Sequence, residues 1–243
     1  SPGGRYVGYI RDQNLFVHDL ESGNEWPITS EGGDTLSYGM AEFVAQEEMG
    51  RSTGYWFSPD DRYVAFTEID ESAIPVSYRV DIQGDGASIA EQRYPYAGEA
   101  NVGIRLFIEN LETGVRVEAD LGDEADIYLA RVNWTPAGQV AVQRQNRAQT
   151  RLDLLLADPE TGESTVILTE TDPAWINLTN DLIFLNDNSF LWTSERSGFR
   201  HIYHYDSAGG LIAQITDGEW QINAIEGVDP DSGRVYFSGW MRD

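Results

Sequence analysis

The sequence predicts an all-β chain, and the recurrence of a turn followed by a strand is the first reason. The pattern Ser-Pro-x-x-Arg-Tyr-Val at residues 1–7 returns at residues 58–64, and a third copy of the turn and strand, with Thr-Pro-Ala-Gly before an apolar run, lies at residues 135–142. Pro beside Gly or Asp sets a tight turn, and the apolar run that follows is typical of a strand. Looser copies of the pattern occupy residues 185–192 and 229–237.

The second reason is another repeated piece, a strand that ends in a glycine turn. It occupies residues 15–23 and 106–114, where Leu-Phe begins the strand and Gly ends the turn, and further copies lie at residues 154–162 and 202–210. Glycine supplies the positive φ that closes such a hairpin. Short strands follow three of these turns, at residues 25–29, 165–169 and 211–216.

Joined in order, the two pieces form a meander of four short strands that repeats about every 35–50 residues, which is typical of the blades of a β-propeller. We count four blades and the start of a fifth within residues 1–243. A β-sandwich is the structural alternative, but a sandwich does not need the same turn chemistry to recur in register. The sequence therefore predicts a β-propeller rather than a sandwich.

A propeller protects its edge strands by closing on itself, and four to five blades do not obviously close. The chain also opens on Ser1-Pro2-Gly3-Gly4, which indicates a turn and has no starting Met. We therefore expect residues 1–243 to be one partial propeller domain cut from a longer protein.

Two insertions break the repeat, one at about residues 40–51 and the other at about residues 70–103. Residues 41–49 contain no Gly or Pro and are rich in Ala, Gln, Glu and Met, which favour helix. The first insertion is therefore predicted to be a short helix between blades. The second carries a glycine-rich turn at residues 84–86. Long loops that leave a rigid scaffold are frequent sites of function.

Composition limits the kinds of partner. The chain has 41% hydrophobic residues, no cysteine and a formal net charge of −25. The apolar fraction is enough for a core. The sequence contains no run of eighteen or more apolar residues, so it predicts no membrane-spanning helix. The negative charge would repel nucleic acid and anionic membranes and attract a cationic group such as a peptide amine. Solubility alone also explains such a charge.

Few residues suggest catalysis or metal binding. The sequence has no G-x-S-x-G nucleophile elbow and no H-E-x-x-H motif, so it predicts neither a catalytic residue nor a metal or cofactor within this chain. His201 and His204 lie on one predicted strand, where residues three apart face opposite sides, and we expect both on the strand surface. His18 has no acidic partner at metal-ligand spacing.

The adjacent carboxylates Glu47 and Glu48 on the predicted helix are the candidate site residues. An acidic pair is usually an ordinary solvated helix face. Glu47, Glu48 and the neighbouring Gln46 occupy successive helical positions, so all three cannot share one face. A pair that faced the interior of the propeller could instead hold an ammonium group between its two carboxylates.

An ordered set of motifs resembles the propeller domain of dipeptidyl peptidase IV and its bacterial relatives, and the resemblance extends over essentially the whole chain. The motifs are EFVAQEE at 42–48, GYWFSPD at 54–60, AFTEIDES at 65–72, RYPYAGEAN at 93–101, WTSERSGFRHIY at 192–203 and GEW at 218–220.

The resemblance implies a role for the acidic pair. In that family a double Glu on a short helix of the propeller binds the free α-amino group of the substrate, and the matching residues are Glu47 and Glu48. Gln46 stands where the family often has a third acid, and Tyr96 replaces a Lys. The family's substrate-binding arginine lies upstream of residue 1, and its Ser-Asp-His triad lies in a downstream α/β-hydrolase domain that is absent from residues 1–243.

The resemblance also implies the reaction. A substrate held by its N-terminus is cleaved only after its second residue, so the parent protein is expected to be a serine peptidase that releases Xaa-Pro or Xaa-Ala dipeptides, with the propeller gating substrate entry. The expected partners are the peptide, the C-terminal hydrolase domain of the same chain and, since family members are often dimeric, a second copy. This chain alone should be inactive, and an extracytoplasmic location is favoured.

Two alternatives remain from the sequence. An oligopeptidase or acylaminoacyl peptidase of the same clan would share the propeller, although the double Glu argues against it. A propeller that only binds other proteins is the non-enzymatic alternative. A G-x-S-x-G elbow beyond residue 243, followed by Asp and His, would favour the peptidase.

Overall fold

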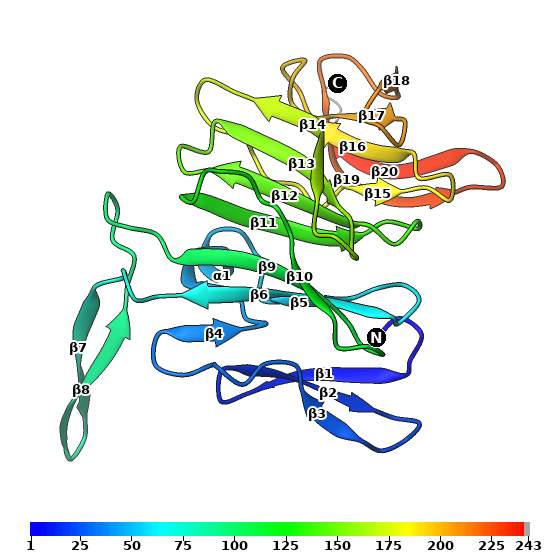
Figure 1. Cartoon of the computed structure of the whole chain (residues 1–243). Coiled ribbons are helices and arrows are strands. Elements are labelled where there is room, and N and C mark those ends of the chain that lie inside the picture. The colour runs from blue at the N-terminus through cyan, green and yellow to red at the C-terminus, as the bar shows by residue number, and fades with distance from the viewer. Residues whose placement is uncertain (241–243) are drawn as a thin grey trace. The chain divides into compact units, whose positions relative to one another are not determined.

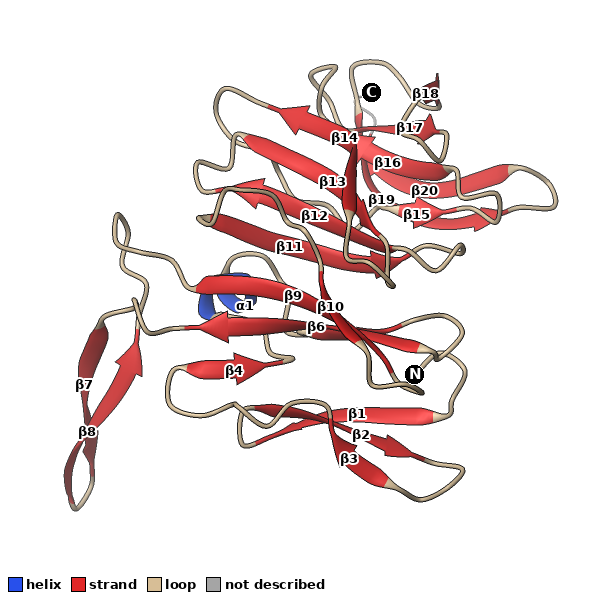
Figure 2. Cartoon of the chain, viewed as in Figure 1, coloured by secondary structure: helices blue, strands red, loops and turns tan. Residues whose placement is uncertain are grey.

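The computed structural model describes residues 1–240. Within these residues the chain forms one short helix and twenty strands (Figure 2). It divides into two compact units, residues 1–129 with 159–162, and residues 130–158 with the residues from 163 onward. Within the first unit, and from residue 140 onward, neighbouring strands pair antiparallel, as expected for meanders joined by tight turns.

The first unit contains three groups of strands. The first sheet has the order β1-β2-β3, the second has the order β10-β9-β6-β4 with β5 also on β6, and β7 pairs only with β8. The bounds of these elements are β1 (Tyr6–Arg11), β2 (Asn14–Asp19), β3 (Glu25–Pro27), β4 (Leu36–Tyr38), α1 (Phe43–Glu47), β5 (Tyr55–Phe57), β6 (Tyr63–Asp70), β7 (Val76–Gln83), β8 (Gly86–Arg93), β9 (Gly103–Asn110) and β10 (Arg116–Glu118).

The second unit holds two four-stranded meanders and a further hairpin, and its first strand begins at the end of the first unit. The orders are β11-β12-β13-β14, β15-β16-β17-β18 and β19-β20. The bounds are β11 (Ile127–Trp134), β12 (Val140–Asn146), β13 (Arg151–Ala157), β14 (Ser164–Thr171), β15 (Ile183–Phe184), β16 (Phe190–Ser194), β17 (His201–Tyr205), β18 (Leu211–Gln214), β19 (Gln221–Asp229) and β20 (Arg234–Trp240).

These sheets confirm the repeat that was predicted. Four sheets follow one another along the chain and a two-stranded fifth begins after them, in the order expected of four blades and the start of a fifth. The turns also form as predicted. The Ser58 amide donates to the carbonyl of Tyr63, which closes the turn before β6, and Gly23 and Gly114 have positive φ angles of 72° and 69°.

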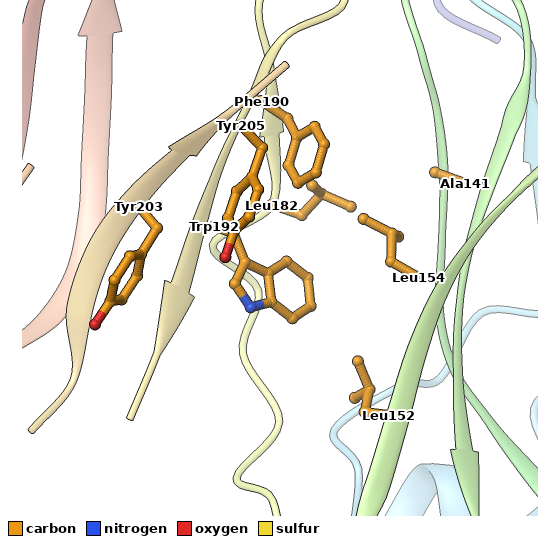
Figure 3. Close-up of a cluster of buried hydrophobic side chains, with 8 residues drawn as sticks. All are labelled: Ala141, Leu152, Leu154, Leu182, Phe190, Trp192, Tyr203 and Tyr205. Atoms are coloured by element: carbon orange, nitrogen blue, oxygen red, sulfur yellow. The ribbon is translucent and has the colours of Figure 1, made fainter. Parts of the chain in front are cut away.

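Each unit has its own apolar core. In the first unit, Leu15 and Val17 of the first sheet pack in one cluster with Val64 and Phe66 of the second. In the second unit, Trp192 and the other aromatic residues of β16 and β17 pack with Leu residues of β13 (Figure 3). Burial of a Leu or Phe side chain contributes roughly 1.5–3 kcal/mol, so these clusters are the main force holding neighbouring sheets together within each unit.

One expectation about histidine was wrong. His204 is partly exposed, but His201 is buried, with Nδ1 near the Thr216 hydroxyl and Nε2 near the Gly218 carbonyl oxygen, both at 3.1 Å. The strand period correctly placed the two rings on opposite faces, but both faces of β17 are covered by other strands or loops. No helix within residues 1–240 is long and apolar enough to cross a membrane.

The second insertion forms a two-stranded ribbon, residues 76–93, which projects from the rest of the first unit (Figure 1). The register of β6 and β9 explains where it leaves the sheet. Asp70, the last residue of β6, lies opposite Gly103, the first residue of β9, so the chain departs and returns at neighbouring positions. The prediction identified this segment as an insertion but did not identify its two strands.

Candidate functional site

The helix α1 lies in an insertion that interrupts one edge of the second sheet. Because β9 occupies the other edge of β6, β4 and β5 follow one another along the same edge, β4 opposite residues 68–70 and β5 opposite residues 64–66. Thr67 is the one residue of β6 left between them. We call residues 39–54, which leave and rejoin the sheet at this point, the helical insertion.

Thr67 fastens both ends of the helical insertion. Its carbonyl accepts from the Gly39 amide at 2.8 Å, and its amide donates to the Gly54 carbonyl at 2.9 Å. Its hydroxyl donates to the Met40 carbonyl at 2.6 Å. The two ends are so close that a Cβ atom at Gly54 would lie 2.2 Å from the Met40 carbonyl oxygen, which only glycine avoids.

The underside of the helical insertion is apolar. Ala45 is fully buried and Met49 nearly so, whereas Gln46, Glu47 and Glu48 are exposed. Phe43 packs edge-on against Tyr94, with 5.0 Å between ring centroids. The helix therefore buries one side in the first unit and presents its acidic side to solvent.

A buried ion pair joins the start of the helical insertion to its end. Arg51 Nη2 donates to Glu42 Oε2 at 2.6 Å, and the two side chains are only 5% and 3% exposed. Arg51 Nη1 donates to the Thr53 carbonyl at 2.8 Å, and Nε donates to the Leu129 carbonyl at 3.1 Å. Burial lowers the pKa of Arg51, and Glu42 opposes that shift. Arg51 stays positively charged because arginine does not lose its proton in proteins.

Glu47 and Glu48 occupy the end of this supported helix. Glu47 is the last residue of α1, and Glu48 is its C-cap, with φ −110° and ψ −29°. Within residues 1–240, neither carboxylate forms a hydrogen bond or ion pair. Gln46 differs, because its amide nitrogen donates to the Ala41 carbonyl at 2.6 Å. The structure thus leaves two adjacent carboxylates free to bind a cation.

The two carboxylates have different surroundings. Glu47 lines an open hollow of about 350 Å³ together with Glu71, in the loop after β6, and Arg93 of β8. Glu48 does not line it. Burial raises the pKa of Glu71, and the charge of Arg93 opposes that rise. The hollow therefore borders one member of the pair and contains charges of both signs.

The described residues do not suggest a metal site. No group of three or more His, Cys, Asp or Glu side chains within residues 1–240 is arranged to hold a metal ion. The chemistry available at Glu47 and Glu48 is therefore that of two exposed acceptors that attract a cationic group.

Comparison with known proteins shows the family. The sequence matches the family described as "Dipeptidyl peptidase IV (DPP IV) N-terminal region" over residues 1–242. The chain belongs to this family. It is 30% identical to a probable dipeptidyl peptidase 4 of Aspergillus fumigatus and 29% identical to a probable dipeptidyl-aminopeptidase B of Uncinocarpus reesii, each over 98% of the chain.

Solved structures agree. The dipeptidyl peptidase 4 of Porphyromonas gingivalis matches with a TM-score of 0.93 and 30% identity, over 98% of this chain and 35% of that one. A putative dipeptidyl aminopeptidase IV of Bacteroides ovatus matches with a TM-score of 0.82 and 28% identity, over the same shares. The prediction of an all-β partial propeller with a short helical insertion, related to dipeptidyl peptidase IV, is confirmed.

The chain corresponds to only one part of these relatives. It spans about a third of the length of the curated relatives that it matches, 33% for the Aspergillus protein and 29% for the Uncinocarpus protein. The family is thus that of the N-terminal region of dipeptidyl peptidases.

Sequence reasoning identified the two exposed acids but missed the residues that support them. Glu42, Arg51 and Thr67 were given no role, although Glu42 and Arg51 lie within the predicted helical insertion and flank the helix that forms. An acid and an arginine on either side of a short run with small and apolar residues could have suggested an ion pair. The contact of Arg51 with Leu129, 78 residues away, has no such local signal.

Proposed function

We propose that this chain is the substrate-gating and amine-binding propeller domain of a serine exopeptidase that releases Xaa-Pro or Xaa-Ala dipeptides. The observation that carries the proposal is the pair Glu47 and Glu48, two exposed carboxylates with no hydrogen-bond or ion-pair partner among residues 1–240, on a helix held by buried bonds. Membership of the dipeptidyl peptidase IV family supports it, since the relatives are dipeptidyl peptidases by name.

Electrostatics favours an ammonium group as the ligand. A carboxylate and an ammonium 4 Å apart attract each other by about 4 kcal/mol at an effective dielectric constant near 20. The chain's net charge of −25 adds a field of the same sign. Peptides with a blocked N-terminus lack this charge, so the pair would select peptides with a free amine.

A fixed amine also explains why a dipeptide would be released. The amine site lies in the helical insertion, whose two ends are bonded to Thr67 and whose helix is flanked by the paired Glu42 and Arg51, so its position is set by the first unit. With the N-terminus held at one place, only the bond after the second residue would reach a nucleophile of the downstream α/β-hydrolase domain. That domain and its Ser-Asp-His triad are the proposed partner supplied by the same protein.

The test removes one charge at a time in the full-length protein that contains this chain. Charged hydrogen bonds contribute about 1.5–3 kcal/mol, so Glu47→Gln and Glu48→Gln should each lower kcat/KM for an Ala-Pro amide by roughly 10- to 150-fold. Steady-state kinetics measure the loss. The matched control is Glu112→Gln, an exposed acid on a turn of the same unit, which should leave kcat/KM unchanged.

An unchanged kcat/KM in both site variants would show that the pair does not bind the amine. The isolated chain, which has no nucleophile elbow, gives the zero-activity baseline for the same assay.

We also propose a second copy of the protein as a partner, docked on the β7–β8 ribbon. The register places Val80 opposite Ile89, and Tyr78 and Ile82 lie on the same face as both. All four are exposed, Ile82 at 84%. The other face carries polar residues such as Arg79 and Asp81. If the apolar faces of the ribbons of two copies packed together, their apolar side chains would be removed from water, which is favourable.

A further inference from the structure

The position of Glu47 and Glu48 depends on bonds made by other residues. The helix α1 has five residues, and isolated helices shorter than about 12–15 residues are marginal in water. Its N-cap residue Glu42 makes no side-chain cap hydrogen bond, because its carboxylate is used by Arg51. The helix therefore cannot hold the two acids in place by its own hydrogen bonds.

Arg51 supplies the missing support from three directions. Its guanidinium binds Glu42 at the start of the helix, the Thr53 carbonyl after its end, and the Leu129 carbonyl on β11. All three nitrogen atoms of the group take part. The planar fork of arginine fits several acceptors at once, and the single ammonium group of lysine does not.

The positive charge of Arg51 does not compete with a substrate's ammonium group for Glu47 and Glu48. Glu42 Oε2 lies 2.6 Å from Arg51 Nη2 and neutralises it, and both side chains are buried. Glu47 and Glu48 are exposed and stay outside this pair. A buried pair of no net charge fixes the helix and leaves the negative charge of the two acids available to an ammonium group.

We propose that Arg51, with Glu42, is the positioning residue of the amine site. Arg51 touches no part of the bound peptide and acts through the helix that carries Glu47 and Glu48. This inference rests on the proposed function of those two acids. The buried pair of Arg51 and Glu42 determines where the two carboxylates lie relative to each other and to the sheet.

The test is Arg51→Lys in the full-length protein. Lysine keeps the positive charge opposite Glu42 but cannot reach all three acceptors, so the helix end shifts and the amine is held less well. We expect KM for an Ala-Pro amide to rise about tenfold, with kcat changed less than about threefold, because uniform substrate binding is lost. Inactivation by an amine-free organophosphate, which needs only the serine nucleophile, should keep its rate.

The matched control is Arg144→Lys in the second unit. Arg144 Nη2 also donates to a buried carboxylate, Asp153 Oδ2, at 2.6 Å. This variant should lower Tm as Arg51→Lys does and leave KM within about twofold, since general loss of a buried pair does not move the amine site. Glu42→Gln is the second site variant. It keeps the shape and one acceptor for Arg51, so KM should rise less than in Arg51→Lys.

The outcomes separate the two proposals. If Glu47→Gln lowers kcat/KM but Arg51→Lys and Glu42→Gln leave KM unchanged, the positioning role is wrong and the amine site stands. An equal rise of KM in Arg144→Lys, or an equal loss of organophosphate reactivity in Arg51→Lys, would also overturn the positioning role. If Glu47→Gln and Glu48→Gln have no effect, the amine site itself is wrong.

Discussion

The helical insertion and the β7–β8 ribbon both leave the second sheet beside β6, and they are held in different ways. The first is fixed by Thr67 at its base and by the buried pair of Arg51 and Glu42. The ribbon is held by its own ladder, and side chains such as Ile82 are exposed on it. The helical insertion, which holds the two acids, buries its polar bonds, whereas the projecting ribbon exposes apolar side chains.

The difference follows from what each insertion presents. A charged hydrogen bond between a carboxylate and an ammonium group forms only at short distance, so the carboxylate has to be held to within about 0.5 Å of the productive position. Buried charged bonds give that accuracy, at a desolvation cost. An apolar face tolerates small shifts, because the hydrophobic effect is not directional. The ribbon therefore needs little beyond its ladder and the aromatic contact between Phe43 and Tyr94 at its base.

The largest expected effect is on the stability of the helical insertion. Glu42→Ala would leave the buried guanidinium of Arg51 without its carboxylate, and removal of one partner of a buried ion pair costs about 3–5 kcal/mol. Urea unfolding followed by tryptophan fluorescence measures the loss. The comparison variant is Glu118→Ala, which breaks an ion pair to Arg105 in which both side chains are about half exposed.

Exposed ion pairs contribute about 0–1 kcal/mol, so the loss in Glu118→Ala should be several times smaller than in Glu42→Ala. Equal losses in the two variants would contradict the view that burial of the Arg51–Glu42 pair is what fixes the helical insertion.

The ribbon should show the reverse behaviour, with a large effect on assembly and a small one on stability. Residues 78–91 can be replaced by Asn-Gly, a two-residue turn that closes an antiparallel pair between Ser77 and Gln92. We expect the full-length variant to lose its dimer in analytical ultracentrifugation. The free energy of unfolding of the first unit should change by less than about 1 kcal/mol, because an isolated two-stranded hairpin adds little stability.

A control on the same ribbon separates its two faces. Ser88→Lys lies on the polar face, opposite Asp81, and should leave the dimer intact. A shortened ribbon that still dimerises would exclude the apolar face as the contact with a second copy. A loss of several kcal/mol on shortening would instead show that the ribbon stabilises the unit.

The two insertions also show what the sequence could and could not predict. The blades were predictable because the turn chemistry repeats, as in Ser58-Pro59 before β6 and Gly114 after β9. The ribbon was missed although Val76, Tyr78, Val80 and Ile82 alternate with polar residues, because it lies outside the repeat. Alternation alone predicts a strand with one apolar face. It does not predict that this face stays uncovered.

The site was predictable in part for a similar reason. The composition of residues 41–49 favours a helix, and two adjacent acids on it could be read directly. The support of that helix could not be predicted in this way, because Thr67 on β6 and Leu129 on β11 are distant from it in sequence and contact the helical insertion only in the folded chain. Local sequence reports which groups a segment carries, whereas long-range contacts decide how firmly they are held.

The smallest expected effect concerns a charged group that belongs to neither insertion. Asp19, at the end of β2, accepts from Arg5 Nη2 at 3.1 Å and from the Glu21 amide at 2.9 Å. The bond from Arg5 is the largest cause that lowers the pKa of Asp19 from 3.8 to about 2. A carboxyl with a lowered pKa in the folded state stabilises that state above its ordinary pKa, and the contribution is lost as the pH falls toward 2.

Asp19→Asn should therefore unfold at lower urea than the unmodified protein at about pH 6, and the gap should narrow between about pH 4 and pH 2. Arg5→Gln should move that narrowing to higher pH, because it removes the main cause of the low pKa of Asp19. Arg5 is 41% exposed, so solvent weakens its bond and the gap should be smaller than the effect of Glu42→Ala. A gap that stayed constant down to pH 2 would show that Asp19 acts only as a turn acceptor for the Glu21 amide, and that the ionised form has no added role.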